Sequence, residues 1–295
     1  MSKQYDDTSI TALKGADRVR LRPSVIFGSD GLDGCCHSFF EILSNSIDEF
    51  RIGCGKKIIV NYYKDNSVEV IDEGRGIPVD YNEKEKAYNW ELLFCEMYAG
   101  GKYDKDESAA YEYSLGLNGL GLCATQYASE YMEAEVYTGE YRYNLKFRKG
   151  KYAAKTKDKQ LEKTPDTHKS GTRIKWRPDI EVFTDIKIPL EYFRETMKKQ
   201  AVVNGGLTLV LNYESEEGTT KESFYYENGI SDYLQEISGE DVLTAPVLWN
   251  AERHGRDRED KPEYKVLLSV AFCFSNKINL IEHYHNSSFL EHGGS

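Results

Sequence analysis

Residues 39–50 read FFEILSNSIDEF, and this segment decides the fold. At about 100° per residue, Asn45 and Asp48 lie within roughly 40° of Glu41 on one face of a helix. The apolar side chains gather on the opposite face, as in an amphipathic helix that packs on a core. They are Cys36, Phe39, Phe40, Leu43, Ile47 and Phe50. Glycines flank the segment on both sides, and we predict a helix over residues 34–52.

A second motif, DEGRGIP at residues 72–78, follows an expected β-hairpin. Residues 58–63 and 67–71 have the composition of two short strands joined by an Asp-Asn turn. Asp72 therefore ends a strand, where its carboxylate can accept a hydrogen bond from an exocyclic amine such as adenine N6. The two glycines of the motif let the backbone approach a flat ring, because they carry no Cβ. In isolation, such a motif is more often an ordinary Asp-x-Gly turn.

A third motif is the long glycine-rich and polar segment at residues 99–121. A loop of this length inside a compact domain is usually functional. Its last part, SLGLNGLG at residues 114–121, precedes a predicted helix over 120–128, and the first N–H groups of a helix can bind phosphate oxygens. The glycine spacing matches neither a P-loop nor a dinucleotide-binding fingerprint. Taken alone, the glycines are also compatible with a flexible hinge.

Together the three motifs indicate an ATPase. Asn45 offers Mg²⁺ an uncharged oxygen, and Mg²⁺ tends to keep several waters while it bridges phosphates. Glu41, on the same face, could hold the attacking water as general base. A solvated helix face is the ordinary interpretation of such residues. The ATPase interpretation is favoured because the three signals occur together, in the order of one known type of site.

Composition excludes several classes of protein. The chain has 295 residues, enough for two domains. It has no apolar run of about 20 residues and no signal-peptide pattern at its N-terminus, so we expect a cytoplasmic protein without a membrane partner. Six cysteines form no Cys-x-x-Cys pair, which favours reduced thiols over a zinc site. The net charge of −11 predicts weak binding of nucleic acid by this chain.

The rest of the chain reads as alternating strands and helices. A basic turn at 18–23 is expected to stop at its proline, and a helix is expected over 82–98. Strands are predicted at 131–138, 141–148, 172–176, 206–213, 221–227, 244–250 and 264–275, with helices at 189–203 and 230–238. We read His283 and His285 as strand or loop residues without metal-binding partners. The charged break ESEEG at 214–218 is the candidate domain boundary.

With these motifs the chain resembles the GHKL ATPases, and within them the B subunits of bacterial type IIA topoisomerases. The resemblance covers nearly the whole chain, with matching stretches at 13–23, 41–49, 72–78, 99–103, 116–121, 171–172 and 286–294. The arginine-rich stretch at 18–23, which ends in a proline, and the AGGKY stretch at 99–103 are typical of topoisomerases. They are not expected in Hsp90, MutL or histidine kinases.

The resemblance implies an α+β fold in two parts. The first is a GHKL (Bergerat) ATPase sandwich, a mixed and largely antiparallel sheet with helices on one face. A partial ribosomal-S5-like α/β transducer domain follows it. The expected bounds are 1–15 for an N-terminal dimerisation arm, 16–215 for the ATPase domain and 216–295 for the partial transducer domain.

The resemblance also implies a role for each site residue. Glu41 is the general base, Asn45 binds Mg²⁺, and Asp72 hydrogen-bonds adenine with help from Thr172 through a shared water. The triphosphate is wrapped by Gly116, Leu117, Asn118, Gly119, Leu120, Gly121 and Leu122, with Lys102 near the phosphates. Other nucleotide-pocket residues are Asp48, Gly76, Ile77, Pro78 and the ion pair of Glu49 with Arg75. Tyr5 of the arm touches the nucleotide of the partner.

The implied function is that of an ATP-binding and ATP-hydrolysing region that closes a dimeric gate and drives DNA strand passage. The implied cofactors are ATP and Mg²⁺. The implied partners are a second copy through the arm, the topoisomerase A subunit in a heterotetramer through regions beyond this chain, and DNA in the full-length protein. Supercoiling and relaxation or decatenation stay open, since the sequence does not separate gyrase from topoisomerase IV.

Two alternatives belong to other classes. One is a nucleotide-binding dimerisation switch without efficient hydrolysis, such as a divergent GHKL paralogue; Glu41 argues against it, because a pure binding module needs no base there. The other is a clamp of the Hsp90 or MutL type, which shares the pocket but lacks the topoisomerase stretches.

The chain departs from the family pattern at several positions. Leu115 stands where gyrases often have glycine and Asn118 where they usually have histidine, which leaves the contacts of the loop open. Thr138 stands where many gyrases have an arginine that binds coumarins, which leaves drug sensitivity open. The phosphate-sensing lysine of the family lies beyond Ser295, so the chain looks like a truncated subunit with slow turnover.

Overall fold

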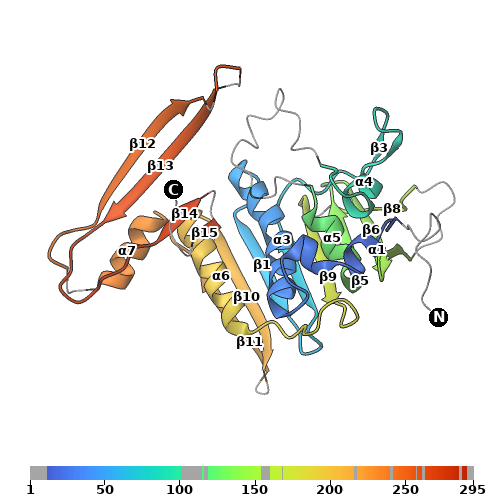
Figure 1. The fold of residues 1–295 in the computed structure, drawn as a ribbon, viewed down its shortest axis with the longest axis horizontal. Coiled ribbons are helices and arrows are strands. Elements are labelled where there is room, and N and C mark those ends of the chain that lie inside the picture. The colour runs from blue at the N-terminus through green and yellow to red at the C-terminus, as the bar shows by residue number, and fades with distance from the viewer. Residues whose placement is uncertain are drawn as a thin grey trace, which may run out of the picture. The chain divides into compact units, whose positions relative to one another are not determined.

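The computed structural model describes most of the chain in two compact units (Figure 1). The described residues are 12–100, 115, 119–153, 160–167, 169–215, 218–239, 242–256, 258–260, 263–285 and 288–290. The first unit contains the residues up to Thr196 together with Leu209–Ser223. The second contains Met197–Thr208 and the residues from Phe224 onward. The domain bounds implied by the resemblance stay predictions.

The first unit is built on a nine-stranded sheet with helices on one face. Its strand order is β11-β10-β1-β2-β9-β5-β6-β7, and β8 pairs with β6. The strands are β1 (Lys57–Tyr62), β2 (Val68–Asp72), β5 (Ser129–Tyr137), β6 (Tyr141–Arg148), β7 (Lys151–Tyr152), β8 (Lys163–Pro165), β9 (Gly171–Pro178), β10 (Thr208–Ser215) and β11 (Gly218–Phe224). The pairs from β1 through β2, β9 and β5 to β6 are all antiparallel.

Helix α3 (Leu32–Arg51) is the predicted amphipathic helix, and it lies across the sheet (Figure 1). Phe39, Leu43 and Ile47 on its apolar face are 0% exposed. Full burial of such a side chain stabilises the fold by about 1.5–3 kcal/mol. Phe40 and Phe50, predicted to belong to the core, are only half-buried. Because its apolar face is buried, α3 turns its polar face toward other elements of the unit.

Strand pairing brings two distant parts of the chain together at the end of β2. The hairpin of β1 and β2 forms as predicted, with Ile58 opposite Asp72. On its other side β2 pairs with β9, and this register places Asp72 opposite Thr172. Because residues at matched positions of neighbouring strands are close in space, the two predicted site residues meet although 100 positions separate them in the chain.

The predicted helix over 82–98 is only partly correct. Helix α4 (Asn89–Cys95) is short, and a small hairpin of β3 (Tyr81–Asn82) and β4 (Ala87–Tyr88) precedes it. The hairpin turn contains Lys86 at φ 53°, a left-handed conformation that ends a right-handed helix. The rings of Tyr81 and Tyr88 pack across the hairpin with centroids 5.3 Å apart. This local hairpin takes the place of the first part of the predicted helix.

The proline of the 18–23 turn begins a helix as well as ending one. Helix α1 (Asp17–Arg20) is followed by α2 (Pro23–Phe27), with Pro23 in its first turn. A proline is tolerated there, because the N–H group that it lacks has no partner within the helix. The later helices lie close to their predicted positions: α5 (Gly121–Tyr127), α6 (Leu190–Val203) and α7 (Ile230–Ser238).

The second unit contains α7 and two antiparallel strand pairs. The longer pair joins β12 (Val247–Gly255) to β13 (Tyr264–Phe272), and the shorter joins β14 (His283–His285) to β15 (Ser288–Leu290). His283 and His285 are thus strand residues. Trp249, Val270 and Phe272 of the longer pair are each more than a third exposed.

Two global properties of the described residues bear on function. Within the described ranges, the structure contains no helix long and apolar enough to cross a membrane. All six cysteines are free thiols. Burial raises the pKa of the Cys36 thiol to about 11, so this group is uncharged at neutral pH.

Candidate functional site

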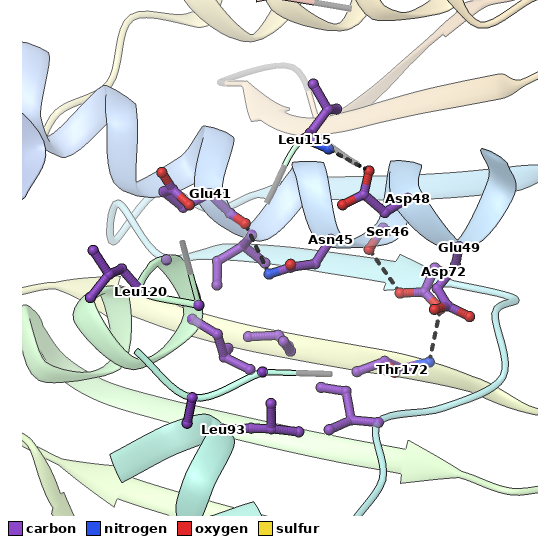
Figure 2. A pocket seen from close by; sticks show the side chains of 18 of the residues that line it. Glu41, Asn45, Ser46, Asp48, Glu49, Asp72, Leu93, Leu115, Leu120 and Thr172 are labelled. Atoms are coloured by element: carbon purple, nitrogen blue, oxygen red, sulfur yellow. Dashed lines mark hydrogen bonds between the residues drawn. The ribbon is translucent and has the colours of Figure 1, made fainter. Parts of the chain in front are cut away.

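A cavity of about 620 Å³ lies beside the polar face of α3 (Figure 2). Its walls come from α3, the turn after β2, the stretch around residues 93–100 and the start of α5. The volume is in the usual range for small-molecule sites, about 300–1,000 Å³. The predicted site residues that line it are Glu41, Asn45, Asp48, Glu49, Asp72, Arg75, Gly76, Ile77, Pro78, Gly119, Leu120, Gly121, Leu122 and Thr172.

Five predicted site residues lie outside the residues that the structure describes. They are Tyr5, Lys102, Gly116, Leu117 and Asn118. Their roles stay predictions. Thr138 is described, and it is absent from the residues that line the cavity.

Asp72 lines the cavity with three hydrogen-bond donors around its carboxylate, two of which, Ser46 and Thr172, are drawn in Figure 2. Its Oδ1 accepts from the backbone N–H groups of Gly74 at 2.9 Å and Thr172 at 3.1 Å. Its Oδ2 accepts from the hydroxyl of Ser46 at 2.8 Å. A carboxylate has about four acceptor sites, so Oδ2 can accept one further hydrogen bond. Burial of the carboxyl group raises the pKa of Asp72, and the three hydrogen bonds oppose this rise.

Glu41 lies at the opposite end of the cavity, between a histidine and the start of α5. Its Oε1 is 3.0 Å from Nε2 of His37, which is one turn earlier on α3. Gly121 packs directly against its carboxylate, and a Cβ at Gly121 would lie 1.9 Å from Oε2. No side chain fits at position 121 unless Glu41 moves. The local geometry therefore fixes the Glu41 carboxylate from two sides.

Asn45 lies between these two ends on the same face of α3. Its Nδ2 donates to the carbonyl oxygen of Glu41 at 3.0 Å, which leaves Oδ1 available to a ligand. Within the described residues, no group of three or more His, Cys, Asp or Glu side chains could hold a metal ion. A cation here would take most of its ligands from a bound molecule and water. That donor set suits Mg²⁺, which binds proteins through few side chains and keeps several waters.

Glu49 and Arg75 form the predicted ion pair at the rim of the cavity. Arg75 Nη2 and Nε donate to the two carboxylate oxygens of Glu49 at 2.8 and 3.0 Å, and its backbone N–H donates at 3.0 Å. Gly74 makes this approach possible, because a Cβ there would lie 2.8 Å from Glu49 Cγ. Half of the Arg75 side chain is exposed, so we expect the pair to shape the rim rather than add much stability.

Asp48 lines the cavity, but its carboxylate is engaged with the backbone of the glycine-rich segment. Its Oδ1 accepts a hydrogen bond from the N–H of Leu115 at 2.8 Å. A second contact holds the same segment further on, where the N–H of Tyr98 donates to the carbonyl of Gly119 at 3.1 Å.

Sequence reasoning missed two polar residues and most of the apolar wall. His37 is one turn from Glu41, so helical spacing could have identified it. Ser46 points away from the Glu41 face and toward the sheet, and only the tertiary structure places it on Asp72. The remaining lining residues are Ile26, Phe27, Ile42, Leu93, Ala99, Gly100, Leu115 and Ile174. Ala99, Gly100 and Leu115 belong to the glycine-rich segment at 99–121, whereas the other five come from elsewhere in the chain and share no sequence signal.

Known proteins of similar sequence and of similar structure point to the same family. No family model matches the chain. It is 31% identical over 301 residues to the DNA gyrase B protein of Chlamydia muridarum, covering 99% of this chain and 36% of that protein. It is 35% identical over 235 residues to the DNA gyrase B protein of Treponema denticola, covering 79% and 36%. The corresponding protein of Thermotoga maritima is 30% identical over 274 residues, covering 93% and 41%. The chain thus spans well under half of the length of these relatives.

Solved structures give the same result. The 43K ATPase domain of Thermus thermophilus gyrase B, in complex with an aminocoumarin, superposes with a TM-score of 0.72 at 27% identity. The match covers 94% of this chain and 67% of that one. The topoisomerase IV ATP-binding domain of Francisella tularensis, in complex with a small-molecule inhibitor, has a TM-score of 0.69 at 25% identity and covers 94% and 68%.

Proposed function

Since the chain is a homologue of the DNA gyrase B protein and has the fold of the gyrase B ATPase domain, we propose that its cavity binds ATP with Mg²⁺ and hydrolyses the ATP. One observation carries the proposal. Asp72, Asn45 and Glu41 follow one another along a single cavity. Asp72 offers an acceptor for a nucleobase, Asn45 a neutral oxygen ligand, and Glu41 a carboxylate that could act as general base. Together these groups can serve the base, the metal ion and the attacking water of a bound nucleoside triphosphate.

We assign the adenine to the Asp72 end. The free acceptor site on Oδ2 of Asp72 matches the exocyclic amine of adenine, and the backbone donors on Oδ1 keep the carboxylate in place. The side chains of Ile77, Pro78 and Ile174 give apolar surface for a flat ring. Thr172 lies beside Asp72, where its hydroxyl could share a water with the base.

We assign the phosphates to the Glu41 end. Asn45 Oδ1 would hold Mg²⁺, whose charge would offset that of the phosphate oxygens. Glu41 takes a proton from a water molecule as the water oxygen bonds to the terminal phosphorus, and ADP departs with the electrons of the broken P–O bond. His37 holds the Glu41 carboxylate in orientation through its hydrogen bond at 3.0 Å. Gly119 to Leu122 line the cavity, and we assign their backbone N–H groups as donors to the phosphates.

The wider role is also a proposal. By homology, ATP binding would join two copies through the arm at residues 1–15, and residues 216–295 would form part of a transducer domain. The full-length protein would then use the gate in DNA strand passage, together with an A subunit. A nucleotide-binding switch without efficient hydrolysis is the alternative, and the placement of Glu41 between His37 and Gly121 favours hydrolysis.

Calorimetric titration with ATP tests the nucleotide site. We expect one ATP per chain, bound more tightly with Mg²⁺ than with a chelator present. Asn45→Ala should reduce the gain from Mg²⁺ by about tenfold, which corresponds to about 1.4 kcal/mol, because it removes a ligand oxygen. Asn144→Ala on β6 is the matched control, since Asn144 is exposed and does not line the cavity. Absence of ATP binding by the wild-type chain would refute the proposed function.

A further inference from the structure

We propose that Asp48 is a positioning residue: it holds the backbone of Leu115 and acts on the nucleotide through the part of the cavity wall that Leu115 forms. The name glycine loop is used here only for its described positions, Leu115 and Gly119–Gly121. The inference rests on the proposed function, since it assumes that the cavity binds ATP. It differs from the role expected from the sequence, which made Asp48 a nucleotide contact.

The first observation is the geometry of Asp48. The residue is 2% exposed, and its Oδ1 accepts the N–H of Leu115 at 2.8 Å. Figure 2 shows its carboxylate turned toward Leu115 and away from Asp72. Burial of a charged carboxylate is costly unless hydrogen bonds compensate it. The contact with Leu115 is therefore part of what keeps Asp48 in place, and it couples the loop to the helix.

The charge of Asp48 is also balanced within the protein. Arg51 lies three residues further along α3, and its guanidinium interacts with the Asp48 carboxylate. Burial lowers the pKa of Arg51, and the charge of Asp48 opposes this effect. Arg51 therefore supplies a positive charge beside Asp48 from the same helix. Asn45 differs from Asp48, because its Oδ1 is available to a ligand.

The second observation is how the loop is held at its described positions. At Gly119, the holding contact is a backbone hydrogen bond from Tyr98. At Gly121, the backbone packs against the Glu41 carboxylate. At Leu115, the holding group is the Asp48 side chain. Leu115 itself lines the cavity, so loss of this contact would release the wall that faces the nucleotide.

Paired substitutions on the two sides of the hydrogen bond test this role. Asp48→Ala removes the acceptor, whereas Asp48→Asn keeps a carbonyl oxygen that can accept the same N–H. Leu115→Pro removes the donor, whereas Leu115→Ala keeps it and removes only the side chain. If Asp48 acts through Leu115, the two variants that break the bond should behave alike, and the two that keep it should resemble the wild type.

The measurement is calorimetric affinity for ATP and for adenosine, which lacks the phosphates. Asp48→Ala and Leu115→Pro should each weaken ATP binding by roughly tenfold, as expected for loss of a hydrogen bond to a charged group. Adenosine affinity should stay within about twofold, since Asp72 is untouched. The Asp48→Ala/Leu115→Pro double variant should be no weaker than either single variant, because both remove one shared interaction. Asp33→Ala, an exposed acid on the same helix, is the control.

Several outcomes would overturn the proposal. Equal losses in Asp48→Asn and Asp48→Ala would mean that the carboxylate contacts nucleotide or cation directly. Additive losses in the double variant would separate Asp48 from Leu115, and unchanged ATP affinity in Asp48→Ala would remove its role. If Asp48→Ala fails to fold, the comparison of Leu115→Pro with Leu115→Ala decides alone. If the wild-type chain does not bind ATP, the proposed function is refuted instead. Titration of the wild type alone shows this, independently of the variants.

Discussion

Replacement of Glu41 by alanine is expected to lower the rate of ATP hydrolysis by about 10²–10⁴-fold and to leave ATP affinity within a few-fold of the wild type. The reason is that the carboxylate takes its proton only as the water attacks, so it contributes to the transition state more than to binding. Phosphate release at saturating ATP measures the rate, and calorimetry measures the affinity.

Gly121→Ala gives an independent version of this prediction. A Cβ at this position would lie 1.9 Å from Glu41 Oε2, so the carboxylate must move although its chemistry is unchanged. Hydrolysis should therefore fall by at least about tenfold, since small misplacements of a catalytic group are costly. Asp33→Ala serves as the control on the same helix. Wild-type phosphate release from the Glu41→Ala variant would exclude Glu41 as the base.

Asp72→Asn is expected to weaken ATP binding by about 100-fold. The two backbone N–H groups on Oδ1 still need an oxygen, so the new amide nitrogen would face the Ser46 hydroxyl and the adenine amine. The substitution removes a charge-assisted hydrogen bond, worth about 1.5–3 kcal/mol, and sets a donor against a donor. Glu73→Gln is the matched control, because Glu73 is the exposed neighbouring carboxylate and does not line the cavity.

The pH dependence of binding follows from the same residue. Burial raises the pKa of Asp72, and the protonated carboxyl loses part of its capacity to accept. ATP affinity should thus be full above this raised pKa and fall as the pH drops through it. In Asp72→Asn that fall should be absent. An equal acid-side loss of affinity in both proteins would assign the titration to another group.

Local patterns in the sequence predict the part of the site that lies on single elements. The helical spacing of Glu41, Asn45 and Asp48 predicts α3 within two residues of its observed start and one of its end. The strand-like composition of 58–63 and 67–71, with the Asp-Asn turn between them, predicts the hairpin and places Asp72 at a strand end. These features succeed because helix and strand periods are properties of a few neighbouring residues.

Such local patterns do not predict contacts between elements. Thr172 meets Asp72 through the pairing of β2 with β9, and only the family resemblance brought it into the site. The Ser46 bond to Asp72 and the Asp48 bond to Leu115 depend on how α3 packs against other segments. The helix expected over 82–98 is shortened by the hairpin of β3 and β4, across which the rings of Tyr81 and Tyr88 pack. Periodicity carries no information on any of these.

The most direct test of the central claim is a crystal structure of the chain with Mg²⁺ and a non-hydrolysable ATP analogue. We predict the adenine amine within hydrogen-bond distance of Asp72 Oδ2, Mg²⁺ on Asn45 Oδ1, and the terminal phosphate beside Glu41. The claim would be contradicted by a nucleotide bound elsewhere on the chain, or by one bound in this cavity with its base at Glu41 and its phosphates at Asp72.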